Sequence, residues 1–107
     1  MTILARSGKA DIQNGQRYID KLCKHWRHKL DIQIDDESAR VVFPKEADDP
    51  DYPQDAIAVF RATDSRLDVH LTAFTRTQLE VLCGVIDDHL DRFAFREGGL
   101  RLVWEAA

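Results

Sequence analysis

The sequence predicts an α+β domain in which an antiparallel sheet carries two helices on one of its faces. Residues 14–29 and 75–92 both have apolar side chains at three- and four-residue spacing, which is typical of amphipathic helices. Residues 66–73 alternate strictly between polar and apolar, which is typical of an antiparallel strand with one solvated face. Because each helix has a single apolar stripe, we expect both helices to cover the same face of the sheet.

The first half of the chain predicts a strand, a helix and two further strands. Residues 2–9 mix apolar and small side chains and form the first expected strand, and Asn14-Gly15 opens the first helix. Strands follow at residues 31–35 and 40–43, separated by a turn at residues 35–38. Residues 44–55 contain all three prolines among many acidic side chains, and we expect a solvated, mobile loop there because proline removes ladder donors.

The second half predicts two adjacent strands, a helix and a last strand. The two strands span residues 56–62 and 66–73, and Thr75 with Gln78 forms the capping box that opens the second helix. Gly98-Gly99 turns the chain toward a last strand at residues 100–104. The complete predicted order is β-α-β-β-β-β-α-β.

Size and composition indicate one globular domain over residues 1–107, with 44% hydrophobic and 32% charged residues. The net charge of −4 disfavours general nucleic-acid binding. No apolar run is long enough to span a membrane and the N-terminus lacks the pattern of a signal peptide, so we expect a cytoplasmic location and no membrane partner. Cys23 and Cys83 fall on the apolar stripes of the two helices and are expected to be buried, reduced thiols.

The two predicted helices carry opposite charges. On the first helix Arg17, Lys21, Lys24 and His28 fall on one line, flanked by His25 and Lys29. On the second helix the polar side is acidic, with Glu80, Asp87, Asp88 and Asp91. One interpretation is that the first helix is a docking face for an anionic partner or ligand. The other is that both faces are simply solvated and attract each other weakly, by under about 1 kcal/mol per exposed pair.

The histidines near the helix ends allow three interpretations. His25 and His89 each lie at the edge of an apolar stripe, and both come near the C-terminal ends if the helices run in the same direction. With His28 and either Asp88 or Asp91 they would supply ligands for an iron or zinc ion. The alternatives are structural histidines that bond to a nearby carbonyl or carboxylate, and acid–base chemistry. No HExxH, CxxC, GxSxG or glycine-rich loop supports a particular catalytic site or another cofactor.

Two segments of the chain resemble signatures of a known family. Residues 17–18 with residues 22–29 resemble the first signature of the bacterial domain-of-unknown-function family 2218, and residues 88–97 resemble its second. An opening strand with Ala5-Arg6-Ser7 and a closing strand that ends in Trp104 also fit, so the resemblance spans most of the chain. Residues 44–55 depart from the family pattern, because this connection is longer and more acidic than is usual there.

The resemblance implies a small two-helix, antiparallel-sheet domain, similar to the TATA-binding-protein-like topology, without an established activity. Some family members are similar to a segment appended to flavin-dependent siderophore-interacting reductases, which implies a setting in iron acquisition. We therefore expect a non-enzymatic accessory or binding module in siderophore or iron handling. Its expected partner is such a reductase, or an anionic ligand such as a ferric siderophore.

The candidate site is a cationic patch on the first helix and at the end of the second. Its members are Lys21, Lys24, His25, His28, Lys29, Arg92 and Arg96, with His89 as a further candidate. The main alternative is a metal-binding protein or metal-dependent enzyme that uses His25, His28 and His89. A third is a homo-oligomer that pairs through the open face of the sheet, although Asp68, His70 and Thr72 make that face polar.

Overall fold

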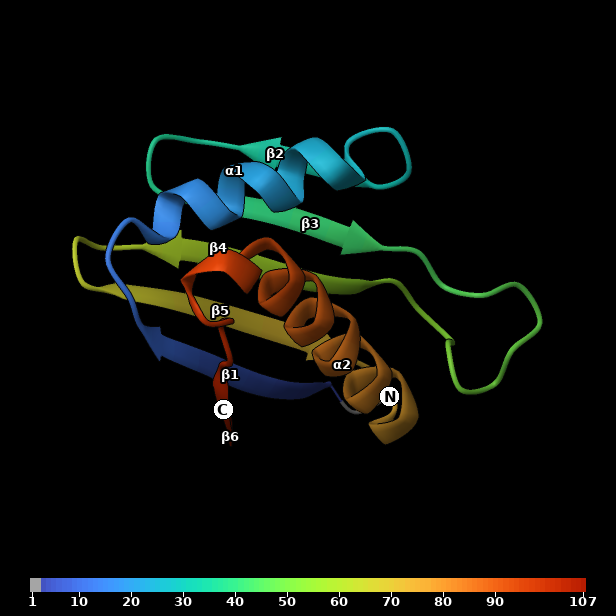
Figure 1. Ribbon diagram of the computed structural model, residues 1–107. Coiled ribbons are helices and arrows are strands. Elements are labelled where there is room, and N and C mark those ends of the chain that lie inside the picture. Colours follow the sequence, from blue (N-terminus) through green and yellow to red (C-terminus); the bar gives the residue numbers. More distant parts are fainter. Residues whose placement is uncertain (1–2) are drawn as a thin grey trace.

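Six strands form one antiparallel sheet in the computed structural model, which describes residues 3–107 (Figure 1). The strands lie in the order β2-β3-β4-β5-β1-β6, so the first strand of the chain pairs with the fifth and the sixth. Their bounds are β1 Leu4–Asp11, β2 Asp31–Ile34, β3 Ala39–Phe43, β4 Ala56–Ala62, β5 Arg66–Ala73 and β6 Val103–Ala106.

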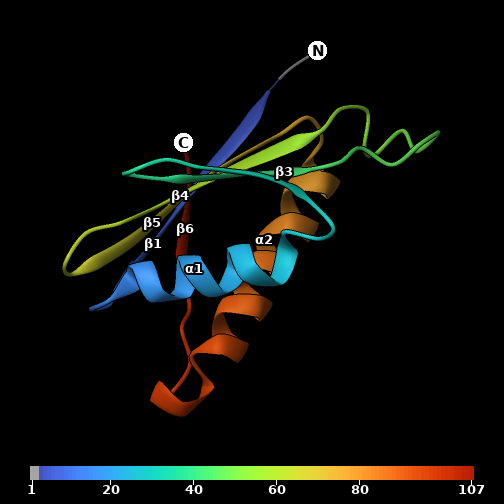
Figure 2. The same ribbon diagram turned by 90° about the horizontal axis from the view of Figure 1, so that it is seen from above.

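Two helices, α1 (Gly15–Trp26) and α2 (Arg76–Phe93), cover the same face of this sheet (Figure 2). A short 3₁₀ helix, η1 (Phe95–Glu97), follows α2 and was not expected from the sequence. The predicted α+β class, the order of the strands and α-helices, and the placement of both helices on one face are confirmed. None of the helices within residues 3–107 is long and apolar enough to cross a membrane.

The core lies between the helices and the sheet. The apolar stripes of the helices are buried there, through Tyr18, Ile19, Leu22, Cys23 and Trp26 of α1 and Leu79, Leu82, Cys83, Ile86 and Leu90 of α2. On β5 the alternate residues Leu67, Val69, Leu71 and Ala73 are fully or almost fully buried, as the alternation predicts. Both cysteines are buried free thiols, and burial raises the pKa of each, which favours the protonated thiol over the thiolate.

The start of α2 is held by the predicted capping box. The Thr75 side chain accepts a hydrogen bond from the Gln78 amide at 3.1 Å, and the Gln78 side chain accepts one from the Phe74 amide at 3.0 Å. The fully buried Gln78 also donates to the carbonyl of Gln54 at 2.8 Å, and the Thr75 hydroxyl donates to the carbonyl of Asp51. The connection over residues 44–55 contains neither helix nor strand, as predicted, and these bonds tie its second half to α2.

Three elements have a boundary that differs from the prediction by two residues or more. The first strand is Leu4–Asp11 rather than residues 2–9, because its pairing with β5 continues to Asp11; its predicted start, Thr2, lies outside the described residues. The first helix ends at Trp26 rather than at residue 29, because the amides of Lys29 and Leu30 both bond to the Trp26 carbonyl in a closing turn.

The last strand is Val103–Ala106 rather than residues 100–104. Gly98 and Gly99 have φ angles of 94° and 90°, which favour glycine, and they reverse the chain after η1. The amide of Leu100 then bonds to the Asp91 side chain at 3.1 Å instead of joining a strand ladder. Leu100 is nevertheless buried. Its apolar side chain fits the alternation of a strand, which is why the sequence predicted a strand from residue 100.

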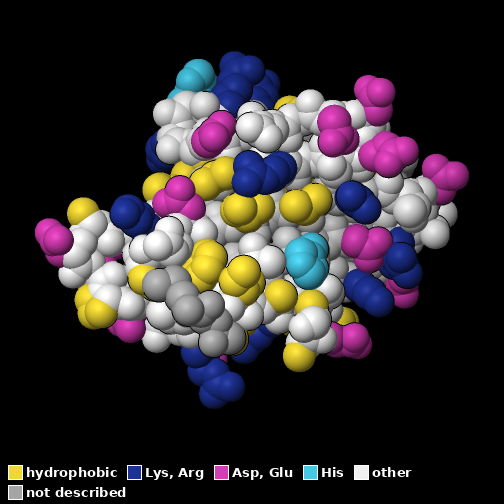
Figure 3. All heavy atoms as spheres, turned by 180° about the vertical axis from the view of Figure 1, so that it is seen from behind, with side chains coloured by type: hydrophobic (Ala, Val, Ile, Leu, Met, Phe, Trp, Pro, Cys, Tyr) yellow, Lys and Arg dark blue, Asp and Glu magenta, His cyan; other side chains and the backbone are white. Residues whose placement is uncertain are grey.

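Within residues 3–107 no helix covers the opposite face of the sheet. Hydrophobic side chains gather in the middle of this face, with Lys and Arg side chains beside them (Figure 3).

Candidate functional site

Exposed basic side chains gather on α1 and in the turn that follows it. Lys21, Lys24 and His25 project from the side of α1 that does not face the core, and His28 and Lys29 from the closing turn. Arg92 at the end of α2 and Arg96 in η1 are exposed as well. We refer to these side chains together as the basic surface: Lys21, Lys24, His25, His28, Lys29, Arg92 and Arg96.

The end of α2 and η1 lie against a flank of α1. Arg17, near the start of α1, forms an ion pair with Glu97 of η1. His25, near the end of α1, contacts His89 and Phe93, with ring centroids 5.1 and 5.9 Å apart. The two helices therefore run in opposite directions where they meet, which excludes the same-direction arrangement considered from the sequence. This arrangement places Phe93, the neighbour of Arg92 in the sequence, against His25 of the basic surface.

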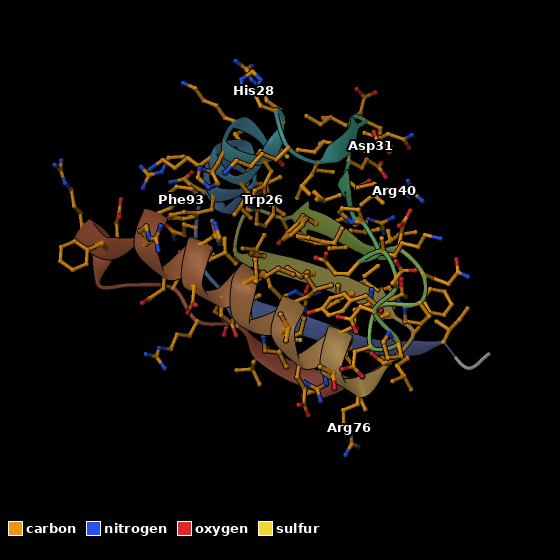
Figure 4. The ribbon with its side chains drawn as sticks, turned by 90° about the vertical axis from the view of Figure 1, so that its right-hand side faces the viewer. Trp26, His28, Asp31, Arg40, Arg76 and Phe93 are labelled. Atoms are coloured by element: carbon orange, nitrogen blue, oxygen red, sulfur yellow. The ribbon has the colours of Figure 1, made fainter. Side chains whose placement is uncertain are left out.

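His28 does not continue the line of basic residues predicted along the first helix. Because α1 ends at Trp26, His28 belongs to the closing turn, where its Nε2 atom lies 3.4 Å from Nε of Arg27. It points away from the sheet and from Phe93 (Figure 4). The other predicted members of the line, Lys21 and Lys24, are helical and exposed as expected.

The other two candidate metal ligands, His25 and His89, do come together. His89 also packs against Trp26, at 5.2 Å between ring centroids, and its Nδ1 donates to the Val85 carbonyl at 2.7 Å. This is the bond to a nearby carbonyl that the structural interpretation expects, and it leaves Nε2 of His89 free. Over residues 3–107 no group of three or more His, Cys, Asp or Glu side chains is placed to hold a metal ion, so the histidine pair lacks a third ligand of its own.

The acidic side chains near the end of α2 are used within the fold. Asp87 accepts a hydrogen bond from Nε1 of Trp104 at 2.9 Å, which fixes the last strand against α2. Asp91 accepts the Leu100 amide at 3.1 Å, and Glu97 pairs with Arg17. Burial raises the pKa of the Asp87 carboxyl group, and the bond from Trp104 opposes that shift. These acids therefore connect α2 and η1 to their neighbours.

The basic surface, in contrast, has no acidic partner within the described chain. Over residues 3–107 the ion pairs are Arg6 with Glu80, Arg17 with Glu97, and Arg66 with Asp68. No member of the basic surface takes part in any of them. Its positive charge is therefore available to an anionic partner.

Phe95 is a residue of this region that the sequence did not single out. Its side chain is 80% exposed and stands between Arg92 and Arg96 in the sequence. The apolar stripe of α2 ends at Phe93, and Phe95 lies off it; this break in the helical spacing is the signal that would have marked it. Exposed aromatic side chains beside Arg are enriched where proteins bind one another.

Comparison with known proteins supports the family and the fold. The model of the family described as "Uncharacterized protein conserved in bacteria (DUF2218)" matches residues 7–105. The NMR structure of PA4090 from Pseudomonas aeruginosa is similar to this chain, with a TM-score of 0.70 and 24% sequence identity over 95% of each chain. At that identity the likeness shows a shared fold. The search of curated proteins found no match.

Proposed function

We propose that this chain, which belongs to the bacterial family DUF2218 as its two signature segments led us to expect, is a non-enzymatic binding module that docks an anionic partner protein. The observation that carries the proposal is the basic surface itself. Its seven side chains are exposed, and none is neutralised by an acidic side chain of the described chain.

A protein partner suits this surface better than a small ligand. The five hollows described on the molecule are lined by other residues, whereas all seven side chains of the basic surface are exposed. Exposed charges steer an oppositely charged protein toward the surface, and a central apolar anchor then supplies much of the affinity. Phe95, beside Arg92 and Arg96, is the anchor we expect.

The first partner to test is a flavin-dependent siderophore-interacting reductase from a bacterium that carries this family. The resemblance of family members to a segment appended to such enzymes suggests it, and a ferric siderophore is the small-ligand alternative. Binding to each is measured by isothermal titration calorimetry at low and at moderate salt. We expect the reductase to bind, and the affinity to fall as salt rises because the attraction is between exposed charges.

A matched pair of double variants localises the contact. Lys21→Glu with Lys24→Glu reverses two charges of the basic surface, and we expect it to abolish reductase binding. Lys45→Glu with Arg76→Glu makes the same charge change at exposed positions outside that surface, and binding should persist. Absence of binding to both the reductase and the siderophore, or equal losses in the two double variants, would remove the proposal.

A metal-binding function is the second candidate, and one observation favours it: the rings of His25 and His89 lie 5.1 Å apart between centroids. An iron or zinc ion held there would take its remaining ligands from water or from a partner. The test is the metal content, by mass spectrometry, of protein purified without chelator, beside His25→Ala. Near-stoichiometric metal that disappears in the variant supports this candidate, and folded protein without metal rejects it.

A further inference from the structure

The open face of the sheet, which Figure 3 shows, lies on the opposite side of the sheet from the two helices. It contains a hollow of about 460 Å³. It lies over β4, β5 and β1, the central strands of the sheet. The volume falls within the usual range of small-molecule sites. No residue of the basic surface lines it, so any ligand here is independent of the proposed docking of a partner.

The strand register explains why the face is hollow at this place. Val59, His70 and Ser7 lie opposite one another on successive strands, and Arg61, Asp68 and Lys9 form the neighbouring row. Val59 and Ser7 have short side chains, whereas the neighbouring row carries the long side chains of Arg61 and Lys9. The difference in side-chain length leaves a depression with an apolar floor at Val59 and a basic rim.

The rim is rich in hydrogen-bond donors. Arg66 is oriented by Asp68, whose carboxylate oxygens lie 3.1 Å from its Nε, and this leaves the terminal nitrogens of the guanidinium free. Nδ1 of His70 lies 3.4 Å from the hydroxyl of Ser7, which leaves Nε2 of the imidazole for a ligand. Arg61 and Lys9 enter no ion pair within residues 3–107.

The charge of the hollow is therefore positive. Asp68 is the one acidic side chain among its lining residues, and it faces Arg61, Arg66 and Lys9. Glu105, opposite Ser7, and Asp11, opposite Arg66, also lie on this face of the sheet, but neither lines the hollow. Guanidinium and ammonium donors around a small cavity recognise the oxygens of phosphate and carboxylate groups.

We propose that this hollow binds a small organic anion through a phosphate or carboxylate group. Arg61, Arg66 and Lys9 bind the charged oxygens, His70 and Ser7 add hydrogen bonds, and the body of the ligand rests on Val59. The chemistry of the donors is shared by phosphate esters and carboxylic acids, so the experiment separates the two.

The test is a titration of ¹⁵N-labelled protein followed by ¹H–¹⁵N correlation spectra, with inorganic phosphate in one series and citrate in another. Sodium chloride at matched ionic strength is the reference. We expect saturable shifts concentrated on residues 59–61, 68–70 and 7–9, beyond those that chloride produces. Saturation with phosphate alone assigns a phosphate ester to the hollow, and saturation with citrate alone assigns a carboxylate.

Two variants of equal charge change complete the test. Arg61→Glu removes one donor from the hollow and should weaken binding by about tenfold or more. Arg76→Glu, at the exposed start of α2, should bind as the unchanged protein does. The same spectra report whether each variant is folded. Shifts no larger than those with chloride, or a folded Arg61→Glu variant of unchanged affinity, would overturn the proposal.

Discussion

The acidic side chains at the end of α2 and in η1 differ from the lysines of the basic surface in what they do for the fold. At the end of α2, Asp87, Asp91 and Glu97 each bond to another part of the chain and hold the C-terminal segment or α1 in place. The lysines of the basic surface, on α1 and in its closing turn, bond to no acidic side chain within residues 3–107. The comparison teaches that the acidic side chains at the end of α2 and in η1 serve the fold, whereas the lysines carry charge that no acidic side chain of residues 3–107 neutralises. The predictions below test that difference, beginning with the largest effect.

Asp91→Ala should cause the largest loss of stability among these polar changes. It removes the acceptor of the Leu100 amide, and hydrogen bonds to charged groups contribute about 1.5–3 kcal/mol. The free energy of unfolding in urea measures the loss. Asp88→Ala, in the same signature at an exposed position, is the matched control and should change stability by less than about 0.5 kcal/mol. Equal effects of the two substitutions would contradict the role given to Asp91.

Asp87→Ala should destabilise the protein by about 1 kcal/mol, because it leaves Nε1 of the partly buried Trp104 without its acceptor. Asp87→Asn keeps an oxygen at that place and should restore most of the loss at neutral pH. Urea unfolding followed by circular dichroism gives both values. A loss in Asp87→Asn as large as that in Asp87→Ala would show that the hydrogen bond to Trp104 is not what Asp87 contributes.

His25 and His89 contact each other, but we expect them to contribute differently to stability. His89→Ala removes the bond to the Val85 carbonyl and the packing against Trp26, so we expect a loss of about 1 kcal/mol. His25→Ala removes an exposed side chain and should cost less than about 0.5 kcal/mol. Thermal and urea unfolding rank the two variants. A larger loss of stability in His25→Ala than in His89→Ala would contradict the structural role given to His89.

The smallest effect is a pH dependence at Asp87. Because burial raises the pKa of this group in the folded protein, its contribution to stability is fully present below the ordinary carboxyl pKa of about 3.9. The contribution is lost as the pH rises through the raised value. Asp87→Asn lacks this loss, so its unfolding free energy relative to the original protein should increase with pH across that window and then level off. A relative stability that decreases with pH there would contradict the raised pKa.

The fold was largely predictable because its signals are local. The two strands over residues 56–62 and 66–73 were placed at their observed bounds, since their alternation reflects one buried and one solvated face. The end of α1 was not predictable from composition, because Arg27, His28 and Lys29 are acceptable helix residues and the closing turn is set by the Trp26 carbonyl. The last strand was misplaced because Asp91, nine residues earlier, takes the amide of Leu100.

The candidate site was predictable only in part. The exposed basic side chains of α1 follow from helical spacing. His25 and His89 do meet, but in helices that run in opposite directions, whereas their expected proximity rested on helices that run in the same direction. The ion pair of Arg17 with Glu97 joins residues 80 positions apart, and local patterns do not indicate such pairs. The hollow on the open face also needs the strand order, because Ser7, Val59 and His70 are neighbours only when β1 lies beside β5.

One pair of unfolding measurements tests most directly the claim that the lysines of the basic surface do not support the fold. The first protein carries Lys21→Gln, Lys24→Gln and Lys29→Gln, and the second carries Asp87→Ala and Asp91→Ala. We predict that urea unfolding leaves the first within about 0.5 kcal/mol of the original protein and lowers the second by about 2 kcal/mol or more. A triple variant destabilised as much as the double variant would show that the lysines support the fold, and the account of the basic surface as free charge would be wrong.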